Sequence, residues 1–251
     1  MSTIRVERAE SGIARLSLNS GSGNPLTPET LDALAGALDS LLADPPKALV
    51  IDGGEGKLFS GGFDVPTIAS YGRDELKAFF GNFLASCSKI ITFPSPTVCA
   101  LHSTAIAGGF ILSLATDFRV VRTGRLKLGL PEVDLGVPVP AGPQALLAAR
   151  TSFQHALRLC TTAETIDGEE ALRIGLADRL APNANEAGLA LARTLANKPG
   201  AGLGRSFVSR PLATRMLAEE ARCHELFLDA WFSDAAQARI QAQAARLSGR
   251  K

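Results

Sequence analysis

The sequence has little net charge and no long uninterrupted apolar run. Its 26 lysine and arginine residues nearly balance 25 aspartate and glutamate residues, so the formal net charge is +1. A chain without a basic excess lacks the electrostatic field that nucleic-acid binding usually requires. No apolar run approaches the roughly 20 residues of a membrane span, and the first residues lack the apolar segment of a signal peptide. We therefore expect no nucleic-acid partner, no membrane span and a cytoplasmic location.

Cysteine and histidine are also sparse, which argues against disulfides and metal sites. The four cysteines form no Cys-x-x-Cys pair, and the three histidines do not cluster with them. A structural zinc site usually needs such a cluster. We expect reduced thiols packed inside the protein, and no metal, flavin or nicotinamide cofactor. The cysteines are Cys87, Cys99, Cys160 and Cys223.

Apolar residues make up 46% of the 251 residues, enough for one domain with an appendage. Apolar runs predict strands in the first half, and stripes at helical spacing predict helices between them. Beyond Pro143 the pattern is almost wholly helical, with a break at 198–204 and two helices hinged near Ser233-Asp234. The sequence therefore predicts an α/β core over residues 1–200 and a C-terminal helical region over 201–251. The expected strands are 4–6, 13–18, 48–51, 97–101, 118–121 and 126–128, and the expected early helices are 28–42 and 74–91.

Two glycine-rich corners follow predicted strands. The stretch 103–117 places Gly108-Gly109 at the start of an apolar helix, and the stretch 53–64 contains two more glycine pairs. Adjacent glycines let a ligand approach backbone N–H groups that have no intrahelical partner. Such donors can stabilise an oxyanion in acyl-group chemistry. Alternatively, Gly108-Gly109 only lets the helix pack closely.

Three ordered blocks link these corners to a third segment. They are Lys57-Leu58-Phe59-Ser60-Gly61-Gly62-Phe63-Asp64, then Pro96 through Asp117, and Leu130-Pro131-Glu132-Val133-Asp134-Leu135-Gly136. In this order they resemble the enoyl-CoA hydratase/isomerase (crotonase) superfamily, and weaker similarity extends over most of the chain. The resemblance implies a crotonase-like spiral of ββα units and C-terminal helices that assemble a homotrimer or hexamer. It also implies an acyl-CoA substrate, with coenzyme A as part of the substrate and no separate cofactor.

The resemblance also implies roles for individual residues. The backbone N–H groups of Phe63 and Gly108 would form an oxyanion hole around the thioester carbonyl oxygen. The backbone at Ser60, Gly61 and Asp64 would lie along the adenine and pantetheine of coenzyme A. Phe63 and Gly108 are thus expected to be catalytic, and the other three to bind coenzyme A.

Glu132 stands where hydratases of the family have one of two glutamates. Those two glutamates, one on the Gly-Gly helix and one in the Pro-Glu block, hold and activate water. Here the position on the helix is Ile111. This pattern resembles Δ3,Δ2-enoyl-CoA isomerases, so we predict double-bond migration with Glu132 as both base and acid, at a pKa raised by apolar surroundings. Ile68, Ile111, Leu130 and the stretch 137–140 would shape an apolar substrate pocket.

Other functions stay open at this point. An enoyl-CoA hydratase or another crotonase-type lyase with one carboxylate is one alternative, and a non-catalytic coenzyme A-binding scaffold is another. In an extended segment Asp134 would share a face with Glu132, which would give a carboxylate pair; the resemblance, however, implies that this position is variable and faces outward. Asp64 is interpreted as a hydrogen-bond acceptor that fixes its loop.

Four further residues have alternative interpretations. His102 is expected to be buried with satisfied hydrogen bonds. Together with Ser113 and an aspartate it would make a catalytic triad, but no nucleophile-elbow pattern is present. Arg246 and Lys251 are expected to lie in a solvated basic tail, with contact to coenzyme A phosphates of a neighbouring subunit as the alternative.

Overall fold

The computed structural model describes residues 2–9 and 11–249. Within that part of the chain the strands form a six-stranded sheet, in the order β1-β2-β3-β4-β6-β9, and a small sheet, β5-β7-β8. In the large sheet β1 and β2 are antiparallel, and each later pair of neighbours is parallel. The large sheet consists of β1 (Ile4–Arg8), β2 (Ile13–Leu18), β3 (Ala48–Asp52), β4 (Thr97–Leu101), β6 (Phe118–Arg122) and β9 (Arg179–Ala181), and the small one of β5 (Ala105–Ile106), β7 (Leu128–Gly129) and β8 (Thr165–Ile166).

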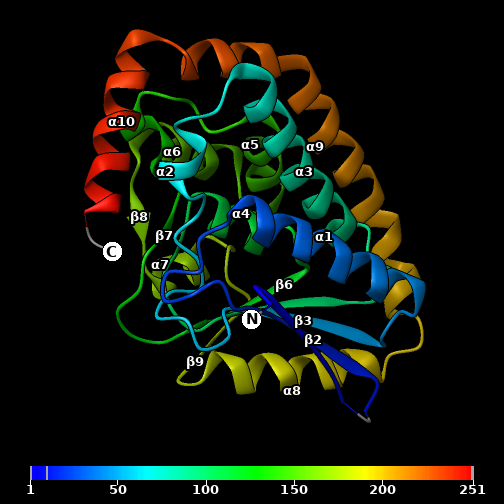
Figure 1. The fold of residues 1–251 in the computed structure, drawn as a ribbon. Coiled ribbons are helices and arrows are strands. Elements are labelled where there is room, and N and C mark those ends of the chain that lie inside the picture. Colours follow the sequence, from blue (N-terminus) through cyan, green and yellow to red (C-terminus); the bar gives the residue numbers. More distant parts are fainter. Residues whose placement is uncertain (1, 10, 250–251) are drawn as a thin grey trace.

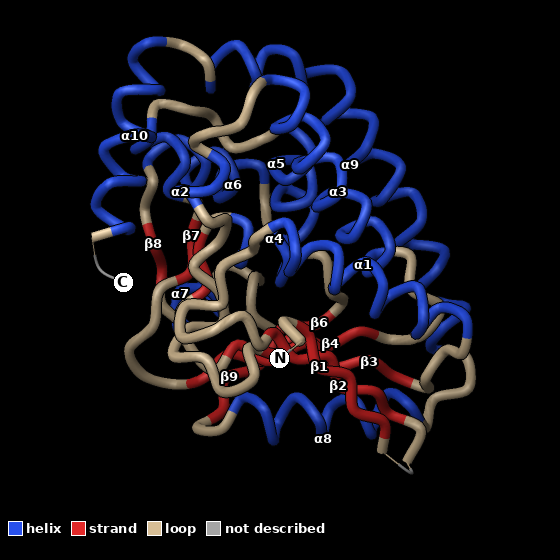
Figure 2. Tube along the Cα trace, in the orientation of Figure 1, coloured by secondary structure: helices blue, strands red, loops and turns tan. Residues whose placement is uncertain are grey.

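Helices cover both faces of the large sheet (Figures 1 and 2). Side chains alternate along a strand, so Ala48 and Val50 of β3 belong to the cluster under α8 (Ala184–Ala196), whereas Leu49 and Ile51 belong to the larger core. Every residue of β3 and β4 is buried, as is typical of parallel strands covered on both faces. The helices on the side opposite α8 include α1 (Pro28–Ala43) and α3 (Arg73–Ile91).

The early helices begin where their sequence signals lie. Thr27 caps α1 by accepting a hydrogen bond from the N–H of Thr30, and Pro28 occupies the first turn. α3 buries the predicted apolar stripe, which includes Phe79 and Phe83. The other elements before the C-terminal region are α2 (Val65–Ile68), α4 (Gly108–Leu114), a 3₁₀ helix η1 (Pro131–Leu135), α5 (Ala141–Arg150), α6 (Phe153–Thr162) and α7 (Gly168–Arg173).

The C-terminal region consists of α9 (Ala201–Trp231) and α10 (Asp234–Ser248). Ser233 caps α10, so the predicted hinge is confirmed. The predicted break at 198–204 is shorter, because α9 already includes Gly202. A Cβ at Gly202 would lie 2.5 Å from the carbonyl oxygen of Pro94, so this glycine serves close packing. The α/β fold with a C-terminal helical region is confirmed, and the division at residue 200 stays a prediction.

Three short strands were not expected from the sequence, namely β5, β8 and β9. The stretch beyond Pro143 is not wholly helical, because β8 joins the small sheet and β9 forms the edge of the large one. At two and three residues, they are too short to show an alternating pattern. Asp167 caps α7, because its side chain accepts a hydrogen bond from the N–H of Glu170. β7 is likewise shorter than the predicted strand 126–128 and overlaps it only at Leu128.

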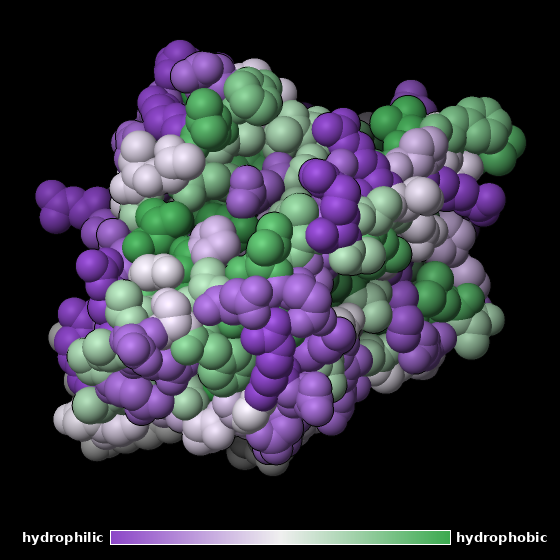
Figure 3. All heavy atoms as spheres, turned by 90° about the horizontal axis from the view of Figure 1, so that it is seen from above, coloured by the Kyte–Doolittle hydropathy of each residue, from purple (hydrophilic) through white to green (hydrophobic). Residues whose placement is uncertain are grey.

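The surface mixes apolar and polar residues. Figure 3, the view from above Figure 1, shows hydrophobic patches among hydrophilic side chains. In the described part of the chain, no helix combines the length and the apolar character that crossing a membrane would require. All four cysteines are free, and three of them are buried.

Candidate active site

Both glycine-rich corners lie at the carboxyl ends of neighbouring parallel strands. β3 leads into the loop 53–64, and β4 leads through residues 102–107 into α4. The loops are joined by hydrogen bonds, since the N–H of Phe59 donates to Thr104 O (3.0 Å) and the N–H of Ile106 donates to Ser60 O (3.2 Å). Ligands of parallel α/β sheets commonly bind at this edge. The topology thus places the two predicted halves of the oxyanion hole side by side.

Close approach of the two corners explains three of their glycines. A Cβ at Gly62 would lie 2.9 Å from Ala107 Cβ and 3.2 Å from the backbone nitrogen of Gly108. A Cβ at Gly108 would lie 2.9 Å from the Phe63 ring. A Cβ at Gly109 would lie 2.5 Å from Ser60 Cβ. Close packing therefore accounts for Gly109, and the structure brings the backbone at 62–63 against that at 107–108.

The two predicted donor groups have no partner inside the protein. Among the described residues, neither the N–H of Phe63 nor that of Gly108 donates a hydrogen bond to a protein acceptor. Ala107, directly before Gly108, has φ 49°, an uncommon conformation for a residue with a Cβ. Such strain often occurs where a backbone group must point in a defined direction. Two unpaired N–H groups on adjacent loops have the chemistry that an oxyanion hole needs.

The side chain of Phe63 holds its own loop in place. Its ring makes edge-to-face contacts with Phe79, Phe80 and Phe83 of α3, at centroid distances of 5.1, 5.2 and 4.9 Å. Such pairs each contribute about 0.5–1.5 kcal/mol beyond the burial of apolar area. The backbone N–H of Phe63 is therefore positioned by a rigid aromatic cluster.

The predicted coenzyme A-binding residues are largely engaged within the loop. Ser60 is fully buried, and its Oγ donates to Asn24 O (2.8 Å) and accepts from the N–H of Gly62 (3.1 Å). The N–H of Gly61 donates to Gly23 O (2.8 Å). Asp64 accepts a hydrogen bond from the Thr67 hydroxyl, which fits its interpretation as a loop-fixing acceptor. Contact of these three residues with coenzyme A stays a prediction.

Asn24 is a structural residue that the sequence did not reveal. It is completely buried, has φ 43°, and its Nδ2 donates to the carbonyl oxygens of Gly53 (2.8 Å), Leu58 (3.1 Å) and Phe59 (3.1 Å). These bonds fasten the start and the middle of the glycine-rich loop to one side chain. A single asparagine in a loop of glycines and serines carries no signal of this role.

Glu132 lies close to the Gly108 corner through the small sheet. β5 and β7 pair in parallel with Ile106 opposite Gly129, and the N–H of Ala107 donates to Gly129 O (2.9 Å). Gly108 thus follows the bonded residue Ala107 by one position, and Glu132 follows the bonded residue Gly129 by three positions. The Oε2 atom of Glu132 is buried and, within the described residues, has no hydrogen-bond partner. This oxygen is therefore not directed into bulk solvent, and Glu132 as a whole is half-buried.

Burial gives Glu132 an unusual protonation equilibrium. Desolvation raises its pKa to about 7, although a hydrogen bond from its own backbone N–H opposes the change. The Cys160 thiol of α6 lies close enough to Glu132 to be affected by its charge. Burial and the negative charge of the Glu132 carboxylate raise the pKa of this thiol to about 12. A carboxyl group with a pKa near 7 can both take up and release a proton at neutral pH.

The raised pKa predicts a stability effect. In an unfolded chain Glu132 titrates near 4.3, so between about pH 4.3 and 7 the folded protein holds a proton that the unfolded chain has lost. The contribution of Glu132 is therefore most favourable below pH 4.3 and is lost as the pH rises to about 7. We expect Glu132→Gln to be more stable than the wild type by about 2–3 kcal/mol at pH 8, with a smaller gain at pH 5. Urea unfolding at both pH values measures this, and a gain independent of pH would contradict it.

The predicted pocket residues are apolar and buried. Ile111 follows Gly108 by one turn of α4, and it, Ile68 and Leu130 are each at most 2% exposed. α10 packs on the segments that carry Ile68 and Leu130. Gln241 Nε2 donates to Ala69 O (3.0 Å) just after α2, and Arg239 Nη1 donates to Asp134 O (3.2 Å) in η1. The C-terminal helix thus lies against the segments on either side of the predicted site.

One carboxylate does not join this arrangement. The outward-facing position expected for Asp134 is confirmed, and the alternative of a carboxylate pair with Glu132 is excluded, because the segment is a 3₁₀ helix and not an extended strand. In a 3₁₀ helix, residues two apart point about 240° apart. Asp134 is exposed, whereas Glu132 Oε2 is buried.

His102 and Ser113 form no triad. His102 Nε2 lies 2.9 Å from Gly56 O and must donate to it. The other ring nitrogen, Nδ1, is buried and has no partner among the described residues, so the expectation of full satisfaction is wrong for one of the two nitrogens. Ser113 Oγ donates to Phe110 O (2.7 Å) within α4 instead. Arg246 is exposed near the end of α10, and Lys251 lies outside the described residues.

Two cavities, of about 520 and 340 Å³, lie elsewhere on the described part of the chain. The larger lies between α5, α6 and α9 and includes Cys160, the thiol that responds to Glu132. Pro138 and Val139, from the stretch expected to shape the substrate pocket, line the larger cavity, whereas the other predicted site residues line neither cavity. The site is therefore identified by its backbone donors and its acid, not by an open volume.

Comparison with known proteins identifies the family. The sequence pattern of the enoyl-CoA hydratase/isomerase family matches residues 8–207. The chain belongs to this family. A relative, a putative enoyl-CoA hydratase from Thermus thermophilus, is 33% identical over 216 residues, which cover 78% of this chain and 85% of the relative. Enoyl-CoA delta isomerase 3 from Arabidopsis thaliana is 31% identical over 164 residues, covering 63% of this chain and 69% of the relative.

A solved structure of the same family has the same fold. The crystal structure of human mitochondrial delta3-delta2-enoyl-CoA isomerase superimposes with a TM-score of 0.91 and covers 99% of both chains. The two sequences are 20% identical. At this identity the similarity shows the shared fold and does not decide between hydration and isomerisation.

Proposed function

We propose that this family member is an enoyl-CoA isomerase that moves a double bond from the 3,4 to the 2,3 position of an acyl-CoA. The observation that carries the proposal is one glutamate with a buried carboxylate oxygen. Glu132 has a pKa of about 7, and its buried Oε2 has no hydrogen-bond partner among the described residues. The position that holds a second glutamate in the family's hydratases is occupied here by Ile111. One acid that exchanges a proton at neutral pH suits a reaction with no net addition of water.

The proposed reaction moves one proton between two carbons. The Glu132 carboxylate removes a proton from C2 of a 3-enoyl thioester, and the electron pair passes into the thioester carbonyl and the adjacent double bond. The N–H groups of Phe63 and Gly108 stabilise the oxygen of the resulting dienolate; one such donor is typically worth about 3–4 kcal/mol. The protonated Glu132 then returns the proton to C4, and the double bond forms between C2 and C3.

Ile111 favours isomerisation over hydration. A hydratase must hold a water molecule and deliver its hydroxyl to C3, for which a second polar group is needed. The Ile111 side chain is buried and apolar and offers no hydrogen bond to water. An apolar wall also strengthens the electrostatic effect of the two N–H donors by excluding water.

Two substrates separate the candidate functions. With a 3-enoyl-CoA we expect a rise in the ultraviolet absorbance of the conjugated thioester; with a 2-enoyl-CoA in water we expect no 3-hydroxyacyl-CoA by mass spectrometry. Hydroxyacyl-CoA from the second substrate would instead identify a hydratase, the activity named for the Thermus relative. No turnover of either substrate, with coenzyme A still bound, would identify a scaffold. Both results would overturn the isomerase proposal.

A further inference from the structure

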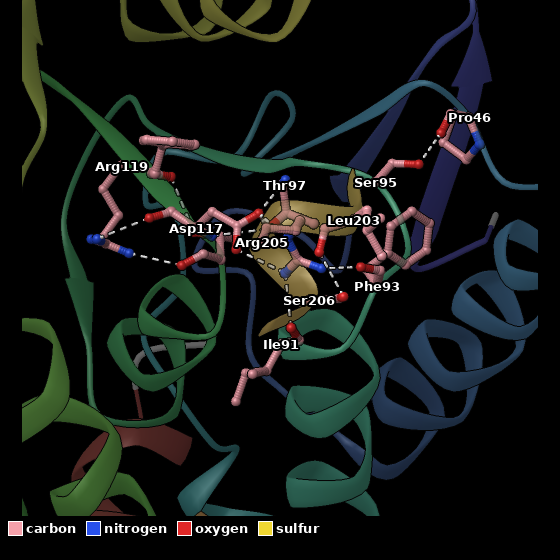
Figure 4. A network of polar contacts seen from close by, with 12 residues as sticks. Pro46, Ile91, Phe93, Ser95, Thr97, Asp117, Arg119, Leu203, Arg205 and Ser206 are labelled. Carbon is pink, nitrogen blue, oxygen red and sulfur yellow. Dashed lines mark hydrogen bonds and ion pairs between the residues drawn. The ribbon is translucent and has the colours of Figure 1, made fainter. Parts of the chain in front are cut away.

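A second cluster of charged residues lies at the opposite edge of the large sheet. Asp117 directly precedes β6 and accepts hydrogen bonds at Oδ2 from the N–H of Thr97 (2.8 Å) and at both carboxylate oxygens from Arg205 of α9 (2.7 and 2.8 Å) (Figure 4). Arg205 also donates to the carbonyl oxygens of Ile91 and Phe93. These groups lie at the amino ends of β4 and β6, whereas the proposed active site lies beyond the carboxyl ends of β3 and β4.

The cations of this cluster outnumber its carboxylates. Arg205 is paired with Asp117, and the buried Arg119 lies 3.4 Å from Asp178. Arg150, the last residue of α5, is the third cation. Among the described residues it has no carboxylate within 4 Å, and its Nε donates only to Leu114 O (3.0 Å).

Arg150 is short of a hydrogen-bond acceptor. Its Nη2 is buried and, in the described part of the chain, has no partner. Burial lowers its pKa to about 10, and the guanidinium groups of Arg119 and Arg205 act in the same direction, while Asp117 and Asp178 oppose them. A buried cation without a counter-ion is costly, so an anion near Nη2 would be strongly stabilised.

Arg150 and Ser209 line the same cavity of about 340 Å³. Ser209 of α9 is 5% exposed, and its Oγ is also buried without a partner among the described residues. Asp117 and Arg205 contribute to the wall, but their charged atoms are already bonded to each other. The rest of the lining is apolar: Pro96, Phe118, Leu195, Ala201, Val208 and Leu212. The residues that line the cavity therefore include one guanidinium nitrogen and one hydroxyl that lack a partner among the described residues and are covered in this structure, together with apolar walls.

We propose that this cavity binds a small monocarboxylic acid, whose carboxylate accepts hydrogen bonds from Arg150 Nη2 and Ser209 Oγ after both side chains turn toward it, and whose short alkyl chain lies among the apolar side chains. A carboxylate matches the single unpaired positive charge and the two free donors. A phosphate dianion would leave several oxygens without donors in an apolar wall. The site is separate from the proposed active site and does not depend on the proposed reaction.

Hexanoate is a suitable probe, with hexan-1-ol and inorganic phosphate as comparisons. By isothermal titration calorimetry of the full chain we expect saturable binding of hexanoate and none of the alcohol or of phosphate. Ser209→Ala removes one donor to a charged acceptor and is expected to weaken hexanoate binding about tenfold or more. Arg150→Gln removes the charge and is expected to abolish binding.

A matched control distinguishes loss of a ligand contact in the cavity from the general effect of removing a buried serine hydroxyl from a helix. Ser86 of α3 is also buried with an unpartnered Oγ, but it does not line the cavity. Ser86→Ala is expected to bind hexanoate like the wild type, and both serine variants should turn over acyl-CoA normally. Hexanoate binding that is unchanged in Ser209→Ala, or equally weakened in Ser86→Ala, would overturn the proposal. The proposal would also be overturned if the wild type failed to bind hexanoate and Ser209→Ala changed the oligomeric state in sedimentation velocity. A second copy of the chain would then occupy the cavity.

Discussion

Replacing Glu132 by glutamine is expected to lower the turnover of a 3-enoyl-CoA by about 10²–10⁴-fold. Glutamine has nearly the same shape, but it neither accepts the C2 proton nor donates one to C4. The loss should appear mainly in kcat, because the predicted contacts with coenzyme A lie in the loop 60–64 and not in η1. Initial rates at saturating and at low substrate concentration measure both parameters.

Asp134 provides the matched control for Glu132. It is a carboxylate in the same 3₁₀ helix, two residues away, but it is exposed. Asp134→Asn removes a negative charge from the same segment and is expected to leave kcat within about twofold of the wild type, as is usual for an exposed surface change. If Glu132→Gln keeps most of its activity, or if Asp134→Asn loses as much, Glu132 is not the proton carrier. Together with the expected gain in stability, a loss of activity would mark Glu132 as a residue kept for function at a cost in folding free energy.

The regular elements were predictable because their patterns are long. The helix expected at 74–91 is α3 at Arg73–Ile91, and the strand expected at 97–101 is β4. An apolar stripe over five turns, or a continuous apolar run between prolines and glycines, leaves few alternatives. β9 was missed because three residues carry no periodicity, and its place in the sheet depends on pairing with β6.

The site was predictable in its residue types and less so in its geometry. Glycine pairs and Pro131-Glu132 point to backbone donors and an acid, but the φ of 49° at Ala107 and the three bonds of Asn24 arise only when distant loops meet. The alternative of a carboxylate pair between Asp134 and Glu132 stayed open for a similar reason, because a proline followed by acidic residues is compatible with both an extended segment and a 3₁₀ turn. Burial decided between them, and burial depends on the whole fold.

Gly62→Ala is expected to lower kcat by about 10²-fold, comparable to removing one oxyanion donor. Gly62 has φ +85°, and a Cβ there would lie 2.9 Å from Ala107 Cβ and 3.2 Å from the nitrogen of Gly108. Relief of this contact must move one loop away from the other, which separates the N–H groups of Phe63 and Gly108. Because this geometry matters most in the transition state, the change should lower kcat more than it raises KM.

Gly124→Ala is the control that isolates this collision from backbone strain. Gly124 has nearly the same φ, +88°, but a Cβ there would meet no atom within 4 Å. Both variants therefore carry the left-handed strain of about 1 kcal/mol, and only Gly62→Ala also forces the corners apart. Urea unfolding should show a similar loss of stability from strain, with an additional loss of about 1–3 kcal/mol for Gly62→Ala. If the two variants have the same kcat, the approach of the two corners does not contribute to catalysis, and the assignment of the Phe63 and Gly108 N–H groups fails.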